Sequence, residues 1–322
     1  MRIIRNLSEL GEPRQPTVVT VGNFDGVHLA HQRLFASVVQ TARRLGAAAT
    51  AVTFDPHPTR ILAPERTPKL LTTLQQKTRL IERLGIELLV VLPFTRELSE
   101  LTPLEFVRQV LVAGLHAVSV HVGQNFRFGH RQEGDVPMLA DLSRKLGFQL
   151  EVLPVVEMRD ERVSSSRIRQ LLSEGRVGRA GRLLGRPYSV GGAIVHGSGV
   201  GKTQTVPTLN LAPVEEQLPK DGVYVTRTRL GERCHESVSN VGHKPTFGEH
   251  RLTVESFLLN FSGELHAAEM KVEFLYRLRD EVKFPDAGAL KAQIQKDVRR
   301  SVKFFRLVKL LKRRETQSVA PA

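Results

Sequence analysis

A regular alternation of short apolar runs and helical patterns in the first half of the chain constrains the fold more than any other feature. The apolar runs, which are typical of buried strands, lie at residues 17–22, 47–54, 87–94, 117–123 and 148–156. Helical patterns separate them, and glycine follows these patterns at positions 46, 85, 114 and 147. Such an alternation forms parallel βαβ units, so we expect a Rossmann-like α/β domain with a parallel sheet covered on both faces. Ligands bind these sheets beyond the carboxyl ends of the strands.

The pattern changes near residue 175. Residues 174–188 are rich in glycine and arginine and read as a junction, so we place the domain boundary between residues 178 and 179. This gives an N-terminal domain of residues 1–178 and a C-terminal domain of residues 179–322. Strand-like runs then follow at residues 189–197, 222–230, 237–242, 252–261 and 269–278. We expect a small antiparallel β-barrel followed by terminal helices, with residues 315–322 disordered.

The formal net charge of +14 favours anionic ligands. Residues 291–314 contain ten Lys or Arg and one Asp, and they space apolar side chains as an amphipathic helix with a basic outer face. A solvated face is the first interpretation of this helix, and contact with nucleic acid or a membrane surface is the alternative. The single cysteine, Cys234, excludes an internal disulfide and a cysteine-based zinc cluster. With no apolar run of bilayer length and no signal-peptide pattern, we expect a cytoplasmic protein with no membrane partner.

The segment GNFDGVHLAH at residues 22–31 follows a predicted strand and opens a predicted helix. His28 and His31 are three residues apart, which places both on one face of the first helical turn. A helix N-terminus presents free N–H groups and the positive end of the helix dipole, which suits phosphate. Two imidazoles beside it can donate hydrogen bonds to a phosphate that gains charge in a transition state. The residues alone leave a surface or capping role open.

The pattern G-x-F-D-G-x-H-x-x-H resembles the signature of the nucleotidyltransferase superfamily. Three further motifs, FDPHP (54–58), GQNFRFGHRQEGD (123–135) and VSSSRIR (163–169), make the chain similar to the bifunctional bacterial riboflavin kinase/FMN adenylyltransferases, or FAD synthetases. The resemblance covers about residues 15–300. It implies that ATP phosphorylates riboflavin to FMN and then adenylylates FMN to FAD with release of pyrophosphate. It also implies ATP as co-substrate and Mg²⁺ as cofactor. We expect no nucleic acid partner and a weak or transient homo-oligomer.

In the N-terminal half, the resemblance implies that His28 and His31 contact the ATP phosphates. It assigns further nucleotide or pyrophosphate contacts to Gly22, Phe24, Ser164, Ser165 and Arg169. It assigns the flavin side to Asn125, Phe126 and Phe128. A helix N-cap for the serines and core packing for the phenylalanines are the alternative interpretations.

In the C-terminal half, residues 196–210 read HGSGVGKTQTVPTLN, which is not a Walker A loop because His196 stands where that motif needs glycine. The resemblance implies a kinase loop instead, with Thr208 and Asn210 as oxygen ligands for Mg²⁺. It implies Glu255 as the base that accepts the proton of the ribityl hydroxyl. A solvent-facing glutamate on an edge strand is the alternative for Glu255. The phosphates of ATP would be wrapped by Gly197, Gly199, Gly201 and Lys202.

The chain departs from the family pattern at several positions. Ala30 replaces the glycine between the two histidines, where glycine lets the nucleotide approach the backbone closely. In the kinase half, Thr205 replaces a glycine, Lys244 an arginine, Phe257 a histidine and Asn260 an aspartate.

Two other functions therefore stay open beside the bifunctional enzyme. One is an enzyme with only the kinase half active. The other is a basic flavin- or nucleic-acid-binding regulator without catalysis.

Overall fold

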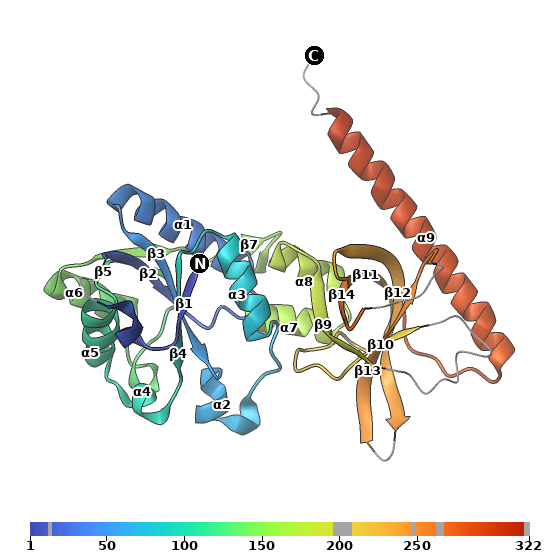
Figure 1. Ribbon diagram of the computed structural model, residues 1–322, viewed down its shortest axis with the longest axis horizontal. Coiled ribbons are helices and arrows are strands. Elements are labelled where there is room, and N and C mark those ends of the chain that lie inside the picture. Colours follow the sequence, from blue (N-terminus) through green and yellow to red (C-terminus); the bar gives the residue numbers. More distant parts are fainter. Residues whose placement is uncertain (12–14, 196–207, 247–248, 262–266, 319–322) are drawn as a thin grey trace. The chain divides into compact units, whose positions relative to one another are not determined.

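The computed structural model describes residues 1–11, 15–195, 208–246, 249–261 and 267–318. Contacts divide the chain into two compact units, Met1–Arg167 and Ile168–Ala322. Each unit has its own sheet and its own hydrophobic core (Figure 1). The predicted boundary between residues 178 and 179 stays a prediction.

The first unit contains the predicted parallel sheet, with strand order β1-β4-β3-β2-β5-β6. Its strands are β1 (Arg2–Ile4), β2 (Thr17–Val21), β3 (Ala48–Asp55), β4 (Leu88–Pro93), β5 (Ala117–Gly123) and β6 (Gln149–Leu153). Every pairing between neighbours is parallel. Five of these strands coincide with the predicted apolar runs. Strand β1 was not predicted, because only three residues form it and its pairing with β4 is remote in sequence.

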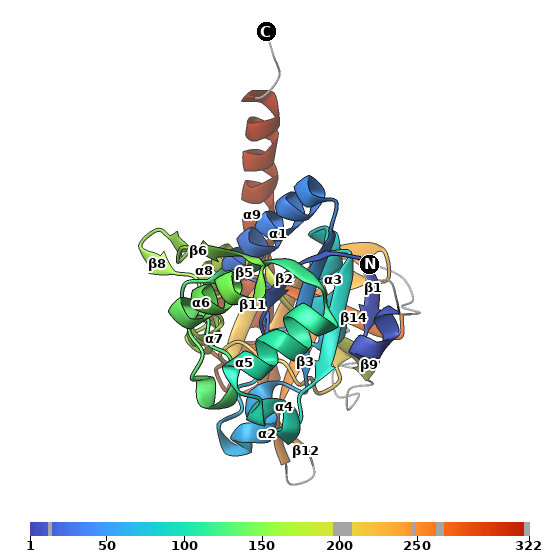
Figure 2. The ribbon, with the colours of Figure 1, turned by 90° about the vertical axis from the view of Figure 1, so that its left-hand side faces the viewer.

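Helices cover both faces of this sheet (Figure 2). Helices α1 (Leu29–Leu45) and α3 (Leu74–Arg83) pack on one face, where Phe35 and Ile81 meet Val18 of β2. On the other face, Val107 meets Val19 of β2, the next residue along the strand. The helices there are α5 (Pro103–Phe106), the π-helix η3 (Val107–Gly114) and α6 (Val136–Leu146). Adjacent β2 residues thus point into opposite cores, which explains why the strand is apolar throughout.

Short elements complete the first unit and connect it to the second. They are η1 (Leu7–Leu10), α2 (Pro58–Leu62), η2 (Pro64–Arg66), α4 (Arg96–Glu100), η4 (His130–Gln132), β7 (Glu157–Met158) and β8 (Glu161–Arg162). Helix α7 (Ser165–Ser173) begins in the first unit and ends in the second. The glycine- and arginine-rich junction is itself helical, since α8 (Val177–Leu184) forms there and packs against the sheet of the second unit.

The second unit confirms the predicted antiparallel barrel, which closes in the order β10-β13-β12-β11-β14-β9. Its strands are β9 (Tyr188–Val195), β10 (Leu209–Leu211), β11 (Gly222–Leu230), β12 (Arg233–Thr246), β13 (Glu249–Leu258) and β14 (Glu269–Arg279). One terminal helix, α9 (Ala287–Ser318), follows the barrel. The expected disorder is therefore wrong for residues 315–318, which continue this helix; residues 319–322 lie outside the described residues.

Hydroxyl groups fill part of the barrel interior. Five fully buried side chains form a ladder of hydrogen bonds with oxygen–oxygen distances of 2.6–2.9 Å: Thr226, Thr228, Ser237, Ser239 and Ser256. The alternate residues of the same strands point outward, where Val225 and Val238 form a core with Phe305 of α9. The ion pair of Arg279 with Asp297, at 2.9 Å, also fixes α9 to the barrel.

Candidate active sites

The predicted motifs of the first unit lie at a topological switch point of its sheet. Strand β2 has β3 on one side and β5 on the other, so the chain leaves β2 and β5 on opposite sides of a crevice at their carboxyl ends. Residues 22–28 follow β2, and residues 124–135 follow β5. This edge of the sheet is where a nucleotide is expected to bind.

Residues 22–28 form a tightly packed loop between β2 and α1. Phe24 is only 2 % exposed, and a side chain at position 22 would come within 2.8 Å of its ring, so Gly22 makes room for Phe24. Phe24 and Val27 have φ angles of 47° and 42°, which non-glycine residues rarely adopt. Each such residue stores about 1–3 kcal/mol of strain, a feature common at functional sites.

The two histidines stack at the start of α1, with ring centroids 3.6 Å apart and planes at 17°. His28 is the N-cap of the helix, and its Nδ1 accepts a hydrogen bond from the backbone N–H of His31 at 3.4 Å. The proton of a neutral His28 ring is therefore on Nε2. Nδ1 of His31 is buried and has no hydrogen-bond partner among the described residues.

Burial lowers the pKa of His31 well below its ordinary value, and the nearby His28 and Lys77 add to this effect. The imidazole of His31 is therefore neutral at physiological pH. A neutral imidazole offers one N–H donor to a ligand and holds no charge of its own.

Asp25 anchors the same loop. Its carboxylate, 3 % exposed, accepts hydrogen bonds from the backbone N–H groups of Leu71 and Thr72 and from the Thr72 hydroxyl. The backbone carbonyl of Asp25 accepts a hydrogen bond of 2.9 Å from the Ser165 hydroxyl, 140 residues away in sequence. Two motifs predicted to bind phosphate are thus in direct contact.

Helix α7 carries the other predicted pyrophosphate ligands. The Ser164 hydroxyl accepts a hydrogen bond from the Arg167 backbone N–H at 3.2 Å, so this serine caps the helix. Arg167 pairs with Glu161. Arg169 lies four residues after Ser165 on α7 and belongs to the second unit.

The three predicted flavin contacts follow β5. Asn125 is exposed in the turn after the strand, and Phe126 is half-buried. Phe128 is 6 % exposed and belongs to the hydrophobic core, where its ring stacks on Phe126 with centroids 5.4 Å apart. Phe126 is therefore better placed for a ligand contact than Phe128, because its ring is more exposed and packs on the buried ring of Phe128.

In the second unit, the predicted base and metal ligand are cross-strand partners. Asn210 of β10 lies opposite Glu255 of β13, and Glu255 lies opposite Asn240 of β12. Directly opposed residues of antiparallel strands point to the same side of a sheet. These three side chains therefore share the outer face of the barrel, since Ser256 on the opposite face belongs to the interior ladder.

The structure describes only some of the other residues predicted for the kinase site. Thr208 is exposed and lies two residues before Asn210, immediately before β10. The amide of Asn240 donates a hydrogen bond of 3.4 Å to the Glu281 carboxylate, so a second carboxylate lies beside Glu255 and the two asparagines. Four predicted phosphate ligands lie outside the described residues: Gly197, Gly199, Gly201 and Lys202.

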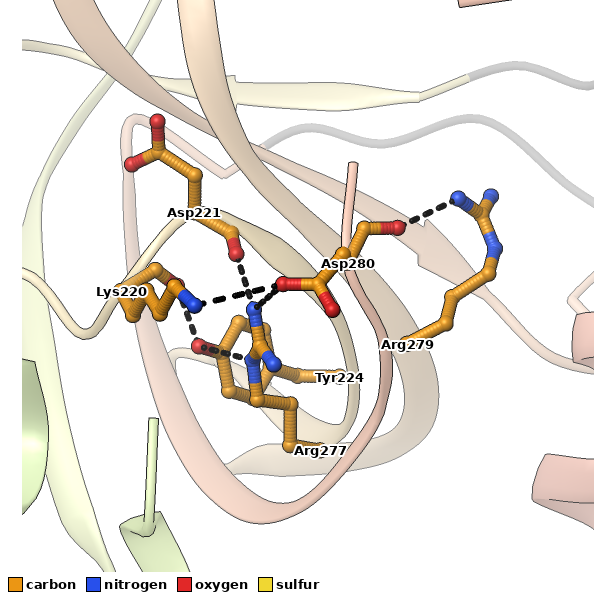
Figure 3. A network of polar contacts seen from close by, with 6 residues as sticks. All are labelled: Lys220, Asp221, Tyr224, Arg277, Arg279 and Asp280. Atoms are coloured by element: carbon orange, nitrogen blue, oxygen red, sulfur yellow. Dashed lines mark hydrogen bonds and ion pairs between the residues drawn. The ribbon is translucent and has the colours of Figure 1, made fainter. Parts of the chain in front are cut away.

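A polar network around Arg277 fixes residues 220–224 (Figure 3). Arg277 donates to the Tyr224 hydroxyl at 3.2 Å, to the Asp221 carbonyl and to the Asp280 carboxylate. Lys220 pairs with the same carboxylate at 3.4 Å. Glycines at positions 175 and 222 leave space for this arginine, because a side chain at 175 would come within 2.5 Å of Arg277 Cδ.

Comparison with known proteins decides the family. The family model for FAD synthetase matches residues 11–167, and that for riboflavin kinase matches residues 184–305. A bifunctional riboflavin kinase/FMN adenylyltransferase of Haemophilus influenzae is 33% identical over 95% of this chain and 99% of its own length. The Bacillus subtilis protein of the same name is 34% identical, with coverages of 91% and 94%. The chain belongs to the bifunctional riboflavin kinase/FMN adenylyltransferase family.

A solved structure agrees with this membership at the level of the fold. A Streptococcus pneumoniae protein, described as a macrolide-efflux protein, superposes with a TM-score of 0.83 at 29% identity. The match covers 92% of this chain and 96% of that one. Among the described residues, no helix combines the length and the apolar character that crossing a membrane requires.

The structure gives a local reason for three departures from the family pattern. Ala30 lies within the first turn of α1, where alanine is a favourable helix residue. Phe257 packs on the core beneath α9. Asn260 has a φ of 52°, a conformation that asparagine tolerates better than most residues. Thr205 lies outside the described residues, as does the side chain of Lys244.

Proposed function

We propose that each unit of this family member catalyses one reaction. The second unit transfers the γ-phosphoryl group of ATP to riboflavin, and the first transfers the adenylyl group of a further ATP to the FMN formed. The pairing of Asn210 with Glu255 supports the kinase site. The hydrogen bond from Ser165 to Asp25 supports the adenylyltransferase site.

In the kinase site, Glu255 orients the ribityl 5′-hydroxyl and accepts its proton as the oxygen attacks the γ-phosphorus, and ADP leaves with the electron pair of the broken P–O bond. Thr208 and Asn210 offer oxygen donors, and these fit a hard cation such as Mg²⁺. When bound with ATP, Mg²⁺ neutralises charge on the phosphates. The chain contributes alignment, since the cross-strand pairing holds Asn210 and Glu255 on one face.

In the adenylyltransferase site, a phosphate oxygen of FMN attacks the α-phosphorus of ATP, and pyrophosphate leaves with the electron pair of the broken P–O bond. No protein nucleophile is needed, so the chain contributes positioning and charge stabilisation. His28 and His31 donate hydrogen bonds to the phosphates. Gly22 and Phe24 shape the loop, Ser164 and Ser165 hold pyrophosphate, and Asn125 and Phe126 face the flavin.

The two reactions can be tested separately in the purified full chain. Riboflavin with Mg²⁺ and ATP should yield FMN and then FAD, separated by chromatography, and absence of FMN would overturn the proposal. FMN without FAD would identify an enzyme with only the kinase half active.

Glu255→Gln should lower FMN formation by about 10²–10⁴-fold, as expected for loss of a general base. FAD formation from supplied FMN should be unchanged in that variant. Glu273→Gln is the matched control, because this glutamate also lies on a barrel strand but forms an ion pair of 3.3 Å with the exposed Lys271. We further propose that the reactions take place in the cytoplasm.

A further inference from the structure

A buried lysine lies beside the histidine pair and belongs to none of the predicted motifs. Lys77 is the fourth residue of α3 and is only 7 % exposed. Its ammonium carries three protons, yet within the described part of the chain it makes one long hydrogen bond, of 3.4 Å, to the Thr53 hydroxyl. Thr53 in turn donates to the carbonyl of Asn23 in the loop between β2 and α1.

The surroundings of Lys77 compensate its charge only partly. Asp25 and Asp55 attract the ammonium from a distance, but burial has the larger effect and lowers the pKa of Lys77. The Asp25 carboxylate is engaged by the backbone of residues 71–72. A cation in the first turns of a helix is also disfavoured by the helix dipole.

A buried ammonium without a close counter-ion has a desolvation penalty of several kcal/mol, which an anion nearby would offset. The adjacent loop of residues 22–28 is predicted to bind an anion. Hydrogen bonds through Thr53 connect Lys77 to the carbonyl of Asn23 in this loop, and the charge of Lys77 also lowers the pKa of His31. His31 also presents a buried Nδ1 with no hydrogen-bond partner among the described residues.

We propose that Lys77 supplies the fixed positive charge of the adenylyltransferase pocket, while the stacked histidines act as neutral hydrogen-bond donors to the same phosphates. The inference rests on the proposed function of the first unit and adds a residue to it. Lys77 stays protonated throughout. As the bond from the α-phosphorus to pyrophosphate breaks, the ammonium stabilises the negative charge that the leaving group gains.

The first test compares Lys77→Met, Lys77→Arg and Thr53→Val in FAD formation from supplied FMN and ATP. Lys77→Met should lower kcat/KM by roughly 10²-fold, mainly through kcat, because the lost interaction strengthens in the transition state. Lys77→Arg keeps the charge and should recover most of this loss. Thr53→Val removes the hydrogen bonds to Lys77 and to the Asn23 carbonyl but leaves the charge, so its kcat should fall much less than that of Lys77→Met.

Riboflavin phosphorylation by the same variants is the internal control and should not change. Wild-type kcat/KM in a folded Lys77→Met would overturn the proposal. If Lys77→Met does not fold, Lys77→Arg decides: a loss of FAD formation in that variant as well would assign Lys77 a structural role. Wild-type protein that forms no FAD would instead overturn the proposed function itself.

The pH profile tests the electrostatic interaction between Lys77 and His31. The titratable groups that act on His31 are His28 at the N-cap of its own helix and Lys77 on α3, while Asp25 and Asp55 act on Lys77. Loss of the ammonium should raise the pKa of His31, so the acid limb of kcat/KM should move to higher pH in Lys77→Met. Superimposable profiles of wild type and a folded Lys77→Met would contradict the inference.

Discussion

Replacing the Asp25 carboxylate by an amide tests how the histidine loop is held. In wild type, Oδ1 and Oδ2 accept from the Leu71 N–H at 3.0 and 3.1 Å, and Oδ1 also accepts from the Thr72 N–H at 3.1 Å. The amide in Asp25→Asn would keep one acceptor and place an NH₂ group against a backbone donor. Hydrogen bonds to a charged acceptor contribute about 1.5–3 kcal/mol each, and a buried unsatisfied donor costs about 1–3 kcal/mol. We therefore expect Asp25→Asn to lower the unfolding free energy of the first unit by about 2–4 kcal/mol.

Calorimetry of the full chain measures this effect. At roughly 2–4 °C per kcal/mol for a unit of this size, the first unit should melt about 4–16 °C lower. FAD formation from FMN should fall, whereas FMN formation from riboflavin should not. Asp141→Asn is the control, because Asp141 is exposed, pairs with the neighbouring Arg144 and should change stability by less than about 0.5 kcal/mol. An Asp25→Asn protein that melts as wild type and forms FAD at the wild-type rate would refute the reasoning.

Three further predictions concern stability. Gly175→Ala should destabilise the second unit by about 1–3 kcal/mol in urea unfolding, because the new methyl group would meet Arg277 at a φ of 74°. Asp297→Ala should lower the urea midpoint of the second unit by the equivalent of about 3 kcal/mol, since the half-buried guanidinium of Arg279 would lose its partner; an unchanged midpoint would show that α9 needs no such pair. The stability of the first unit should fall as the pH drops below 6.5, because the pKa of His31 is lowered in the folded state and the unfolded state then binds more protons; His31→Gln should flatten this dependence in acid titrations.

Much of the fold follows from local pattern. The helix Leu29–Leu45 ends where Gly46 adopts a left-handed conformation, as the spacing predicts. Along the barrel strands, apolar and polar residues alternate with a period of two, and this pattern predicts strands from the sequence. Strand β1 and helix α8 were not predicted, because β1 has too few residues for a pattern and α8 is rich in glycine and arginine, which favour other structures.

The arrangement of the site residues was predictable only where their spacing in the sequence determines which side chains share a face. The three-residue interval of the histidines predicts their shared face, and the stacked rings confirm it. Asp25 belongs to the quoted motif, but its contacts with residues 71–72 lie far away in sequence. Lys77 and Arg277 also depend on distant partners, and no local pattern distinguishes these two from surface charges. The sequence offers one signal for Lys77: it occupies a position that the helical period places on the buried face of α3, together with Ile81.

The interior ladder of the barrel has a consequence for the kinase site. Ser239 and Ser256 hydrogen bond at 2.6 Å inside, on the same two strands that oppose Asn240 and Glu255 outside. A slip of one residue between β12 and β13 would leave several buried hydroxyls unsatisfied and would turn Glu255 inward. Apolar side chains tolerate small shifts, whereas hydroxyls accept only a narrow range of geometry. Directional hydrogen bonds thus fix the strand alignment of the barrel, and the orientation of the proposed catalytic carboxylate is set by side chains in the barrel interior.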